Sequence, residues 1–500
     1  MKALLRTSSI AVLALVATGC VTAPPAVLKP QDVPSAFTAP IAKDAPIWPK
    51  PDWWKGFGST ELDGLIADAQ ENNLDLAVAA ARVLQADAQT DIAESALFPD
   101  ISLGASARRQ GQNRGGPNSN FNTFGASLSA SYELDFWGLA RSNLRAADES
   151  LKSAQFARQV VALTVTAGVA NTYLDVLALR ERVTIAQQNI DAANRILSIT
   201  EAKVTNGVAS RLDLAQQQAL VAGQKAQVPG LEEASREAGY ALAVLLGRVP
   251  EGFGVKGENL NGIVSPTVAP GLPSELLRRR PDVAAAEAEL AAAHANVDAA
   301  RAAFFPHIDL TASGGYASTA LSALFNPASL GFSIGASLLQ TVFDGGRLLG
   351  ESRLARAQQM ELVANYRNTV LSAFQDVESA LGQVASLAEQ EKYKTEQVDA
   401  ASEAFRISEI QYREGVADLL NVLQAQQTLF SAQDQLVQIK LARIQADIGL
   451  YRALGGSWAE DPEDATQPIP VSVTAPANAP MPADTTPPKD AAPATDTKKG

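Results

Sequence analysis

Four segments of the chain alternate apolar with small polar residues, a two-residue period that predicts strands with one apolar and one polar face. These segments lie at about 100–110, 124–135, 307–318 and 329–342. The Gly- and Asn-rich stretch 111–123 between the first two predicts a loop. Strands of this kind are typical of outer-membrane barrels, although a soluble antiparallel sheet with one wet face has the same local pattern.

Two longer segments have a helical period instead. Neither 139–205 nor 347–414 contains a proline, and a helix of that length extends on the order of 100 Å. Apolar residues recur at every seventh position in both segments, with one interruption at Glu391, and the spacing continues after Gly415. The positions are Val169, Val176, Val183, Ile190, Leu197 and Val204, then Val370, Val377, Val384, Val398, Phe405 and Tyr412, then Leu423, Phe430, Val437, Ile444 and Tyr451. Sustained heptads predict coiled-coil packing between long helices.

The two halves of the chain repeat each other. The matching stretches are Asn73–Leu76 with Arg280–Val283, Leu97–Leu103 with Phe304–Leu310, and Asn206–Ala209 with Glu414–Ala417. In each half a shorter helical pattern, 61–97 in the first, ends before a proline. We therefore expect a tandem duplication with repeats at 61–247 and 274–456, joined by a Gly- and Pro-rich linker, 248–273.

The two ends of the chain have other compositions. Residues 1–19 have a basic start and a short apolar core, which predicts a signal peptide. Cys20 follows in a context that resembles a bacterial lipobox and is the predicted lipidation site, although an ordinary signal with a chance cysteine is the alternative. Residues 20–60 read as a lipidated linker, and the Pro- and Ala-rich tail 457–500 as disordered. No other stretch is long and apolar enough for a membrane helix by this criterion, so we expect any spanning structure to be β.

Composition narrows the possible functions. The chain has 41 Lys and Arg against 54 Asp and Glu, a net charge of −13, which disfavours nucleic acid as a partner. A single cysteine excludes an internal disulfide, and two histidines, His294 and His307, leave little for metal or imidazole chemistry. We therefore expect no catalytic residue, no metal and no cofactor.

Four strands per chain require several chains to assemble. Known single-chain barrels have at least about eight strands, and an open sheet edge in lipid leaves backbone groups without hydrogen bonds. The chain must therefore combine with other copies to form one pore, with the helices continuing below it as a conduit.

The duplication and several motifs resemble the TolC-like outer-membrane efflux factors, most closely the NodT-type lipoproteins that serve RND (resistance-nodulation-division) pumps. The motifs are Leu272–Val283, Ala299–Pro306 and Leu423–Gln427. The resemblance implies a mainly α fold with a small membrane β part. Long coiled-coil helices would form a periplasmic α-barrel, and four transmembrane strands per chain would complete a 12-stranded barrel in a homotrimer.

The resemblance also implies a function and partners. The chain would be a passive outer-membrane duct for drugs or other small toxic compounds. Its partners would be outer-membrane lipid, a periplasmic membrane-fusion adaptor and an inner-membrane RND pump. The duct of a type I protein-secretion system remains an alternative, as does a poreless coiled-coil lipoprotein of the envelope.

Two sites follow from the resemblance. Two turns would dock the adaptor at the periplasmic tip. Their residues are Asn206, Gly207, Val208, Ala209 and Ser210, and Glu414, Gly415, Val416, Ala417 and Asp418. Beside the tip, the predicted gate contains Asp213, Asn421, Gln424 and Arg211. Asn421 and Gln424 are neutral where the family often has acids, which argues against a strongly anionic gate. An Arg211–Asp418 latch is possible, but solvated charges are the commoner outcome.

Overall fold

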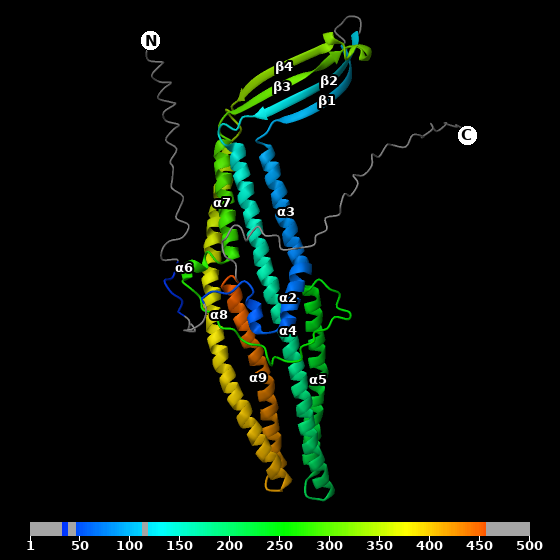
Figure 1. The fold of residues 1–500 in the computed structure, drawn as a ribbon, viewed down its shortest axis with the longest axis vertical. Coiled ribbons are helices and arrows are strands. Elements are labelled where there is room, and N and C mark those ends of the chain that lie inside the picture. Colours follow the sequence, from blue (N-terminus) through cyan, green and yellow to red (C-terminus); the bar gives the residue numbers. More distant parts are fainter. Residues whose placement is uncertain (1–32, 39–46, 113–118, 457–500) are drawn as a thin grey trace, which may run out of the picture.

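The computed structural model describes residues 33–38, 47–112 and 119–456. The molecule is elongated, with a sheet at one end and long helices leading from it to two turns at the other end (Figure 1). The predicted signal peptide, Cys20 and the tail lie outside the described residues, as does part of the linker that follows Cys20.

The first helical segment of the chain is divided in two, which corrects the single helix expected over 61–97. The segments are α2 (Thr60–Asn72) and α3 (Leu74–Ser95). Asn73 between them has an extended backbone, and its side chain accepts a hydrogen bond from the Leu76 N–H. An asparagine in this position is a helix N-cap. It therefore starts a second helix in a stretch whose apolar period is continuous.

Two long helices form the body of the molecule, α4 (Leu139–Thr205) and α8 (Arg347–Arg413), within one residue of the expected bounds. Each turns back into a shorter partner, α5 (Arg211–Leu245) and α9 (Leu419–Ala453), that packs beside it. The remaining short elements are η2 (Trp53–Phe57), α6 (Pro273–Leu276), α7 (Pro281–Ala302), η3 (Leu321–Ala323) and η4 (Pro327–Ser329).

The heptad positions lie mainly between the helices. Val169, Val377 and Phe430 are all buried. The polar interruption at Glu391 has a physical reason, because its carboxylate accepts a hydrogen bond of 2.6 Å from Arg443 of α9. An ion pair thus replaces one apolar contact between the two helices.

The sheet contains β1 (Asp100–Gln112), β2 (Ser119–Glu133), β3 (His307–Ser318) and β4 (Leu330–Leu339). All neighbours are antiparallel in the order β1-β2-β3-β4, so the β2–β3 pair joins the two repeats. The first hairpin is longer than the sequence indicated, because the expected loop 111–123 contributes paired residues at both ends. The outer strands leave two edges of the sheet open.

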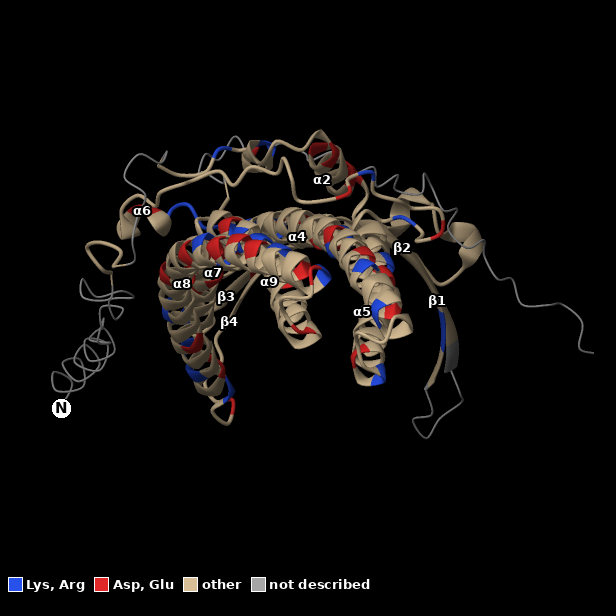
Figure 2. Cartoon of the chain, turned by 90° about the horizontal axis from the view of Figure 1, so that it is seen from below, with Lys and Arg blue, Asp and Glu red and all other residues tan. Residues whose placement is uncertain are grey.

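The main core lies where the two repeats meet, halfway along the helices. Phe57, Leu62 and Leu174 are fully buried there. Viewed from the tip end, α8, α7 and α4 follow an arc, and α2 and α6 lie on its convex side (Figure 2). Trp53 stacks on Tyr451 of α9 with ring centroids 5.1 Å apart. The linker tryptophan thus fixes the layer on the convex side, called the outer layer below, to the bundle.

One expectation about membrane helices was wrong. Within the described residues, α4 contains a window of 18 residues with a mean hydropathy of 1.5, long and apolar enough to cross a membrane by composition. Half of that window is buried inside the molecule. Its apolar character is therefore used in the core, where Val165 and Leu177 of α4 are buried.

Candidate functional site

The two turns at the tip have the same backbone geometry in both repeats. Gly207 and Gly415 have φ of 72° and 78°, a left-handed conformation that favours glycine. In each turn the following valine N–H donates to a carbonyl five residues earlier, over 2.8 Å. This geometry ends one helix and reverses the chain into the next. All ten predicted tip residues lie in or beside these turns.

The tip also exposes apolar side chains at equivalent positions of the two repeats. Val208 and Val416 are 72% and 78% exposed. Leu212 and Leu420, in the first turns of α5 and α9, are 65% and 67% exposed. Sequence reasoning missed these two leucines, although their equivalent places in the two repeats were a signal. Contiguous exposed apolar side chains are a common feature of interaction surfaces.

The predicted gate residues lie just above the tip, and among the described residues no hydrogen bond or ion pair joins them to one another. Asp213 is held by its own helix: its carboxylate accepts the Ser210 N–H over 2.8 Å, and the Ser210 hydroxyl accepts the Asp213 N–H over 3.1 Å. This is a capping box, for which Ser-x-x-Asp in the sequence was the signal. Asn421 and Gln424 are exposed on α9.

The alternative of an inter-helix latch is not formed. Arg211 and Asp418 are both exposed, and no ion pair joins them in the described part of the chain. These two charges are solvated, as is common for exposed pairs.

The polar face of the sheet carries a continuous row of serines. The register places Ser102 opposite Ser129, Ser129 opposite Ser313, and Ser313 opposite Ser333. The hydroxyls of the first and last of these pairs lie 3.1 and 2.9 Å apart, within hydrogen-bonding distance. The alternation predicted this polar face. It did not predict the shared row, because register depends on pairing between distant strands.

The apolar face of the same sheet is exposed. Leu103, Phe332 and Ile334 are each more than four-fifths exposed. Apolar side chains facing outward and small polar ones facing the other way are the arrangement of a membrane barrel wall.

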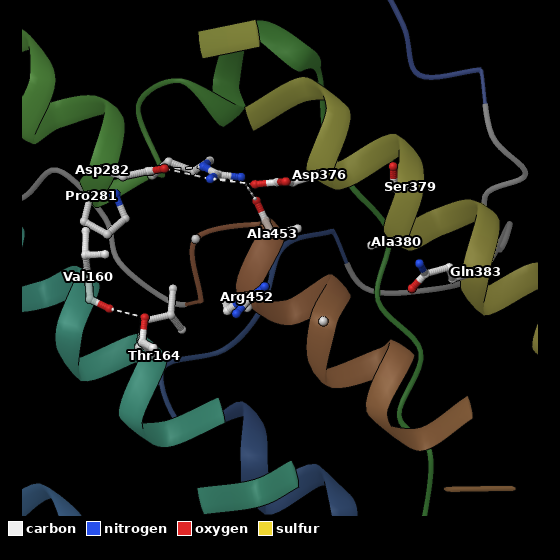
Figure 3. Close-up of a pocket in the computed structure, with 14 residues that line it drawn as sticks. Val160, Thr164, Pro281, Asp282, Asp376, Ser379, Ala380, Gln383, Arg452 and Ala453 are labelled. Carbon is white, nitrogen blue, oxygen red and sulfur yellow. Dashed lines mark hydrogen bonds and ion pairs between the residues drawn. The ribbon is translucent and has the colours of Figure 1, made fainter. Parts of the chain in front are cut away.

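A pocket of about 330 Å³ lies where the two repeats join, between α4, α7, α8 and α9 (Figure 3). Arg280 lies at its edge with its guanidinium 2.7 Å from Asp282 and 3.0 Å from Asp376. Burial disfavours the charged form, but these two carboxylates outweigh it and raise the pKa of Arg280. Arg280 also donates to the Ala453 carbonyl of α9 over 3.1 Å. Arg280 therefore joins the start of α7 to α8 and to the end of α9.

Comparison with known proteins places this geometry in a family. The profile of the outer membrane efflux protein family matches residues 65–248 and 272–456. The pyoverdine export outer membrane protein OpmQ of Pseudomonas aeruginosa is 43% identical over 82% of this chain and 88% of its own length. The toluene efflux pump outer membrane protein TtgC of Pseudomonas putida is 33% identical over 83% and 87%. The probable outer membrane lipoprotein SilC of Salmonella typhimurium is 30% identical over 91% and 99%.

Solved structures agree with the fold. The outer-membrane channel OprN superposes with a TM-score of 0.81 at 28% identity, over 88% of this chain and 100% of that one. The open state of the Neisseria gonorrhoeae MtrE outer-membrane channel gives 0.79 at 30% identity, over 88% and 99%.

Proposed function

The chain belongs to the outer membrane efflux protein family, and from this premise we propose that it is a trimeric exit duct whose cargo is a compound of the pyoverdine class. Its relatives are transport channels of the outer membrane, and this chain is such an efflux channel. The trimer, the cargo and the docking sites are the proposed parts. The repeats 61–247 and 274–456 serve as its two halves.

The open sheet supports the trimer. The β1 and β4 edges have no partner within the described residues, and unpaired backbone in lipid costs several kcal/mol per group. Pairing β1 of one copy with β4 of the next satisfies both edges. Three copies supply about twelve strands, a size within the range of known barrels.

The proposed cargo rests on the sequence identity of this chain to two named relatives. OpmQ, named for pyoverdine export, is 43% identical to this chain, whereas TtgC, named for toluene efflux, is 33% identical. The uncharged serine row on the polar face of the sheet favours a large hydrogen-bonding solute over an apolar solvent.

A deletion strain separates these cargoes. Restoring the gene is expected to restore pyoverdine in the culture medium, measured by liquid chromatography and mass spectrometry. Toluene and antibiotic tolerance is expected to change little. Recovery of tolerance with no change in export would assign a toxic-compound cargo instead, and unchanged behaviour in both assays would refute an efflux role.

The tip turns serve as the adaptor-docking surface of this assembly, and the exposed pairs Val208–Val416 and Leu212–Leu420 support that role. The double variant Val208→Asp/Val416→Asp is expected to lower export at least about tenfold, because a buried carboxylate weakens an apolar contact. Val249→Asp is the control, since Val249 is 70% exposed and follows the end of α5 that is opposite to the tip turn. Full export by the tip variant would refute docking there.

Cys20 is the proposed lipid attachment point, and the relative SilC is named a lipoprotein. Cys20→Ser is expected to abolish incorporation of a labelled fatty acid. Label that persists in the variant would refute this site.

A further inference from the structure

A second pocket, of about 660 Å³, lies where β2 leads into α4 and α7 leads into β3. Its lining includes Trp137, Arg145, Asp148, Arg301 and Phe305, all from one chain. None of these residues belongs to the tip, the gate or the repeat joint. The pocket lies at the level where the sheet ends and the helices begin.

Aromatic side chains mark this level as a membrane boundary. Trp137 and Phe305 stack with centroids 4.6 Å apart, and Phe136 meets Trp137 edge-on at 5.1 Å. The Trp137 indole donates to the Pro306 carbonyl over 2.8 Å, yet the residue remains 42% exposed. Half-exposed aromatic rings at the ends of membrane strands occupy the headgroup level of a bilayer. The polar groups beside them therefore lie among headgroups of the periplasmic leaflet.

Two of the guanidinium groups in the pocket, those of Arg145 and Arg301, retain unused donors, whereas Arg141 is engaged by Asp135. Asp298 is shared by two arginines at long distances, 3.9 Å from Arg145 and 3.4 Å from Arg301. Arg145 also donates to the Ser142 hydroxyl over 2.9 Å. Each guanidinium has five N–H donors, so most of them stay available. A phosphate between Arg145 and Arg301 would accept charge-assisted hydrogen bonds from both.

A negative group lies in the same pocket. Asp148 makes no hydrogen bond and no ion pair with any residue that the structure describes. An unpaired carboxylate next to arginines disfavours a purely anionic ligand but suits the ammonium of a zwitterion. The charge pattern therefore fits phosphate and ammonium on one headgroup.

The pocket lies on the outer surface of the conduit. Tyr173 and Arg180 of α4 contact the outer layer, the first through Glu61 and the second through the Val255 and Gly257 carbonyls. This layer is on the convex side of the helix arc (Figure 2). Arg145 precedes them by four and five whole heptads respectively, so a heptad-packed helix presents it on the same side. Lipid can reach that side.

The duplicated half does not repeat the whole basic group. Helix α3 corresponds to α7 residue by residue, and both have 22 residues. Arg301 then corresponds to Glu94, and Asp298 to Asp91. The equivalent part of α3 is thus acidic. Arg145 corresponds to Arg353 of α8, so it is the second arginine, Arg301, that is particular to the α4–α7 side.

From these observations we propose that Arg145, Arg301 and Asp148 bind the headgroup of a zwitterionic phospholipid from the periplasmic leaflet. The phosphate lies between the two arginines, the ammonium lies at Asp148, and the acyl chains follow the apolar face of β2 and β3. This inference rests on the outer-membrane location of the chain. It does not depend on the number of copies or on the cargo, because one chain forms the whole pocket.

Native mass spectrometry of the full-length protein in mild detergent tests the proposal with phosphatidylethanolamine as the added lipid. One tightly bound lipid per chain is expected to saturate. Arg145→Ala/Arg301→Ala is expected to weaken binding at least about tenfold through the lost charge-assisted hydrogen bonds. Arg353→Ala is the control, since Arg353 is an exposed arginine of α8 near the same level.

Asp148→Asn, which keeps the side-chain shape, provides a second readout. It is expected to weaken phosphatidylethanolamine binding but not that of phosphatidylglycerol, which lacks the ammonium. Unchanged affinity in both variants would overturn the proposal. So would equal binding of soluble glycerophosphoethanolamine, which would indicate a site for a free phosphoester. Export is measured separately in the deletion strain, and failure of the restored gene to change export there, with lipid binding intact, refutes only the proposed function.

Discussion

Arg280 joins the start of the second repeat to the middle of α8 and to the end of α9. It is 8% exposed and contacts Asp282, Asp376 and the end of α9. Its counterpart in the first repeat, Asn73, donates to the Leu245 carbonyl at the end of α5 over 2.7 Å. Each repeat thus has an equivalent joint, which is made by an amide in the first repeat and by a guanidinium held by two carboxylates in the second.

This joint predicts the effect of a single substitution. Arg280→Met is expected to lower the free energy of unfolding by about 2–3 kcal/mol, because it leaves two carboxylates and a carbonyl without their donor. The loss is below that of a fully buried pair, since Asp376 is half exposed. Denaturant unfolding of the detergent-solubilised protein measures it. Arg278→Met, at an exposed position, is expected to stay within about 0.5 kcal/mol; an equal loss there would contradict the assignment.

At the scale of elements, the sequence predicted the helices that follow from a regular apolar period. It missed the features that depend on a single helix cap. The long helices follow from proline-free heptads, and α4 begins and ends where expected. The break at Asn73 was missed because the apolar period continues through it. The capping role of Asp213 was missed because family resemblance directed attention to a gate.

Two glycines allow the chain after α5 and after α9 to pass close to the joints at Asn73 and Arg280. Gly247 and Gly455 have φ of 66° and 85°. A Cβ on Gly247 would overlap the Asn72 carbonyl, and one on Gly455 would overlap the Arg279 carbonyl. Within each repeat, the start and the end are therefore joined by a close backbone contact as well as by a polar one.

Gly455→Ala is expected to destabilise the protein by about 2–3 kcal/mol, through the strained φ and the backbone overlap together. Gly223→Ala is the matched control, because Gly223 lies inside α5 with nothing within 4 Å of its added Cβ. That change is expected to stabilise by about 0.5–1 kcal/mol. Thermal unfolding of the two variants checks both, and a stable Gly455→Ala protein would contradict the close contact.

At the scale of the whole molecule, the charge around the tip bears on conduction. The carboxylate of Asp213 is engaged in a capping box, while Asn421 and Gln424 are neutral and exposed. We therefore expect weak ion selectivity. Asn421→Asp/Gln424→Glu is expected to shift the reversal potential toward cation preference in planar bilayers, since rings of carboxylates attract cations. No shift would place these side chains away from the pore.

The assembly was predicted from the sequence through one physical argument, that four strands leave open edges. The internal order of the sheet and its serine row required the structure, because pairing between the repeats is not local. The partner of each edge is another copy of the chain in this account.

Disulfide crosslinking across the proposed β1–β4 boundary tests that central claim most directly. Cysteines are placed in pairs on the polar face, one at Ser102, Gly104 or Ser106 of β1 and one at Ser333 or Ser337 of β4. Oxidised outer membranes are then resolved by denaturing electrophoresis. The account predicts that at least one pair gives a covalent ladder that ends at three copies. A ladder that ends at two copies, or no ladder from any pair, would contradict a barrel shared by three chains.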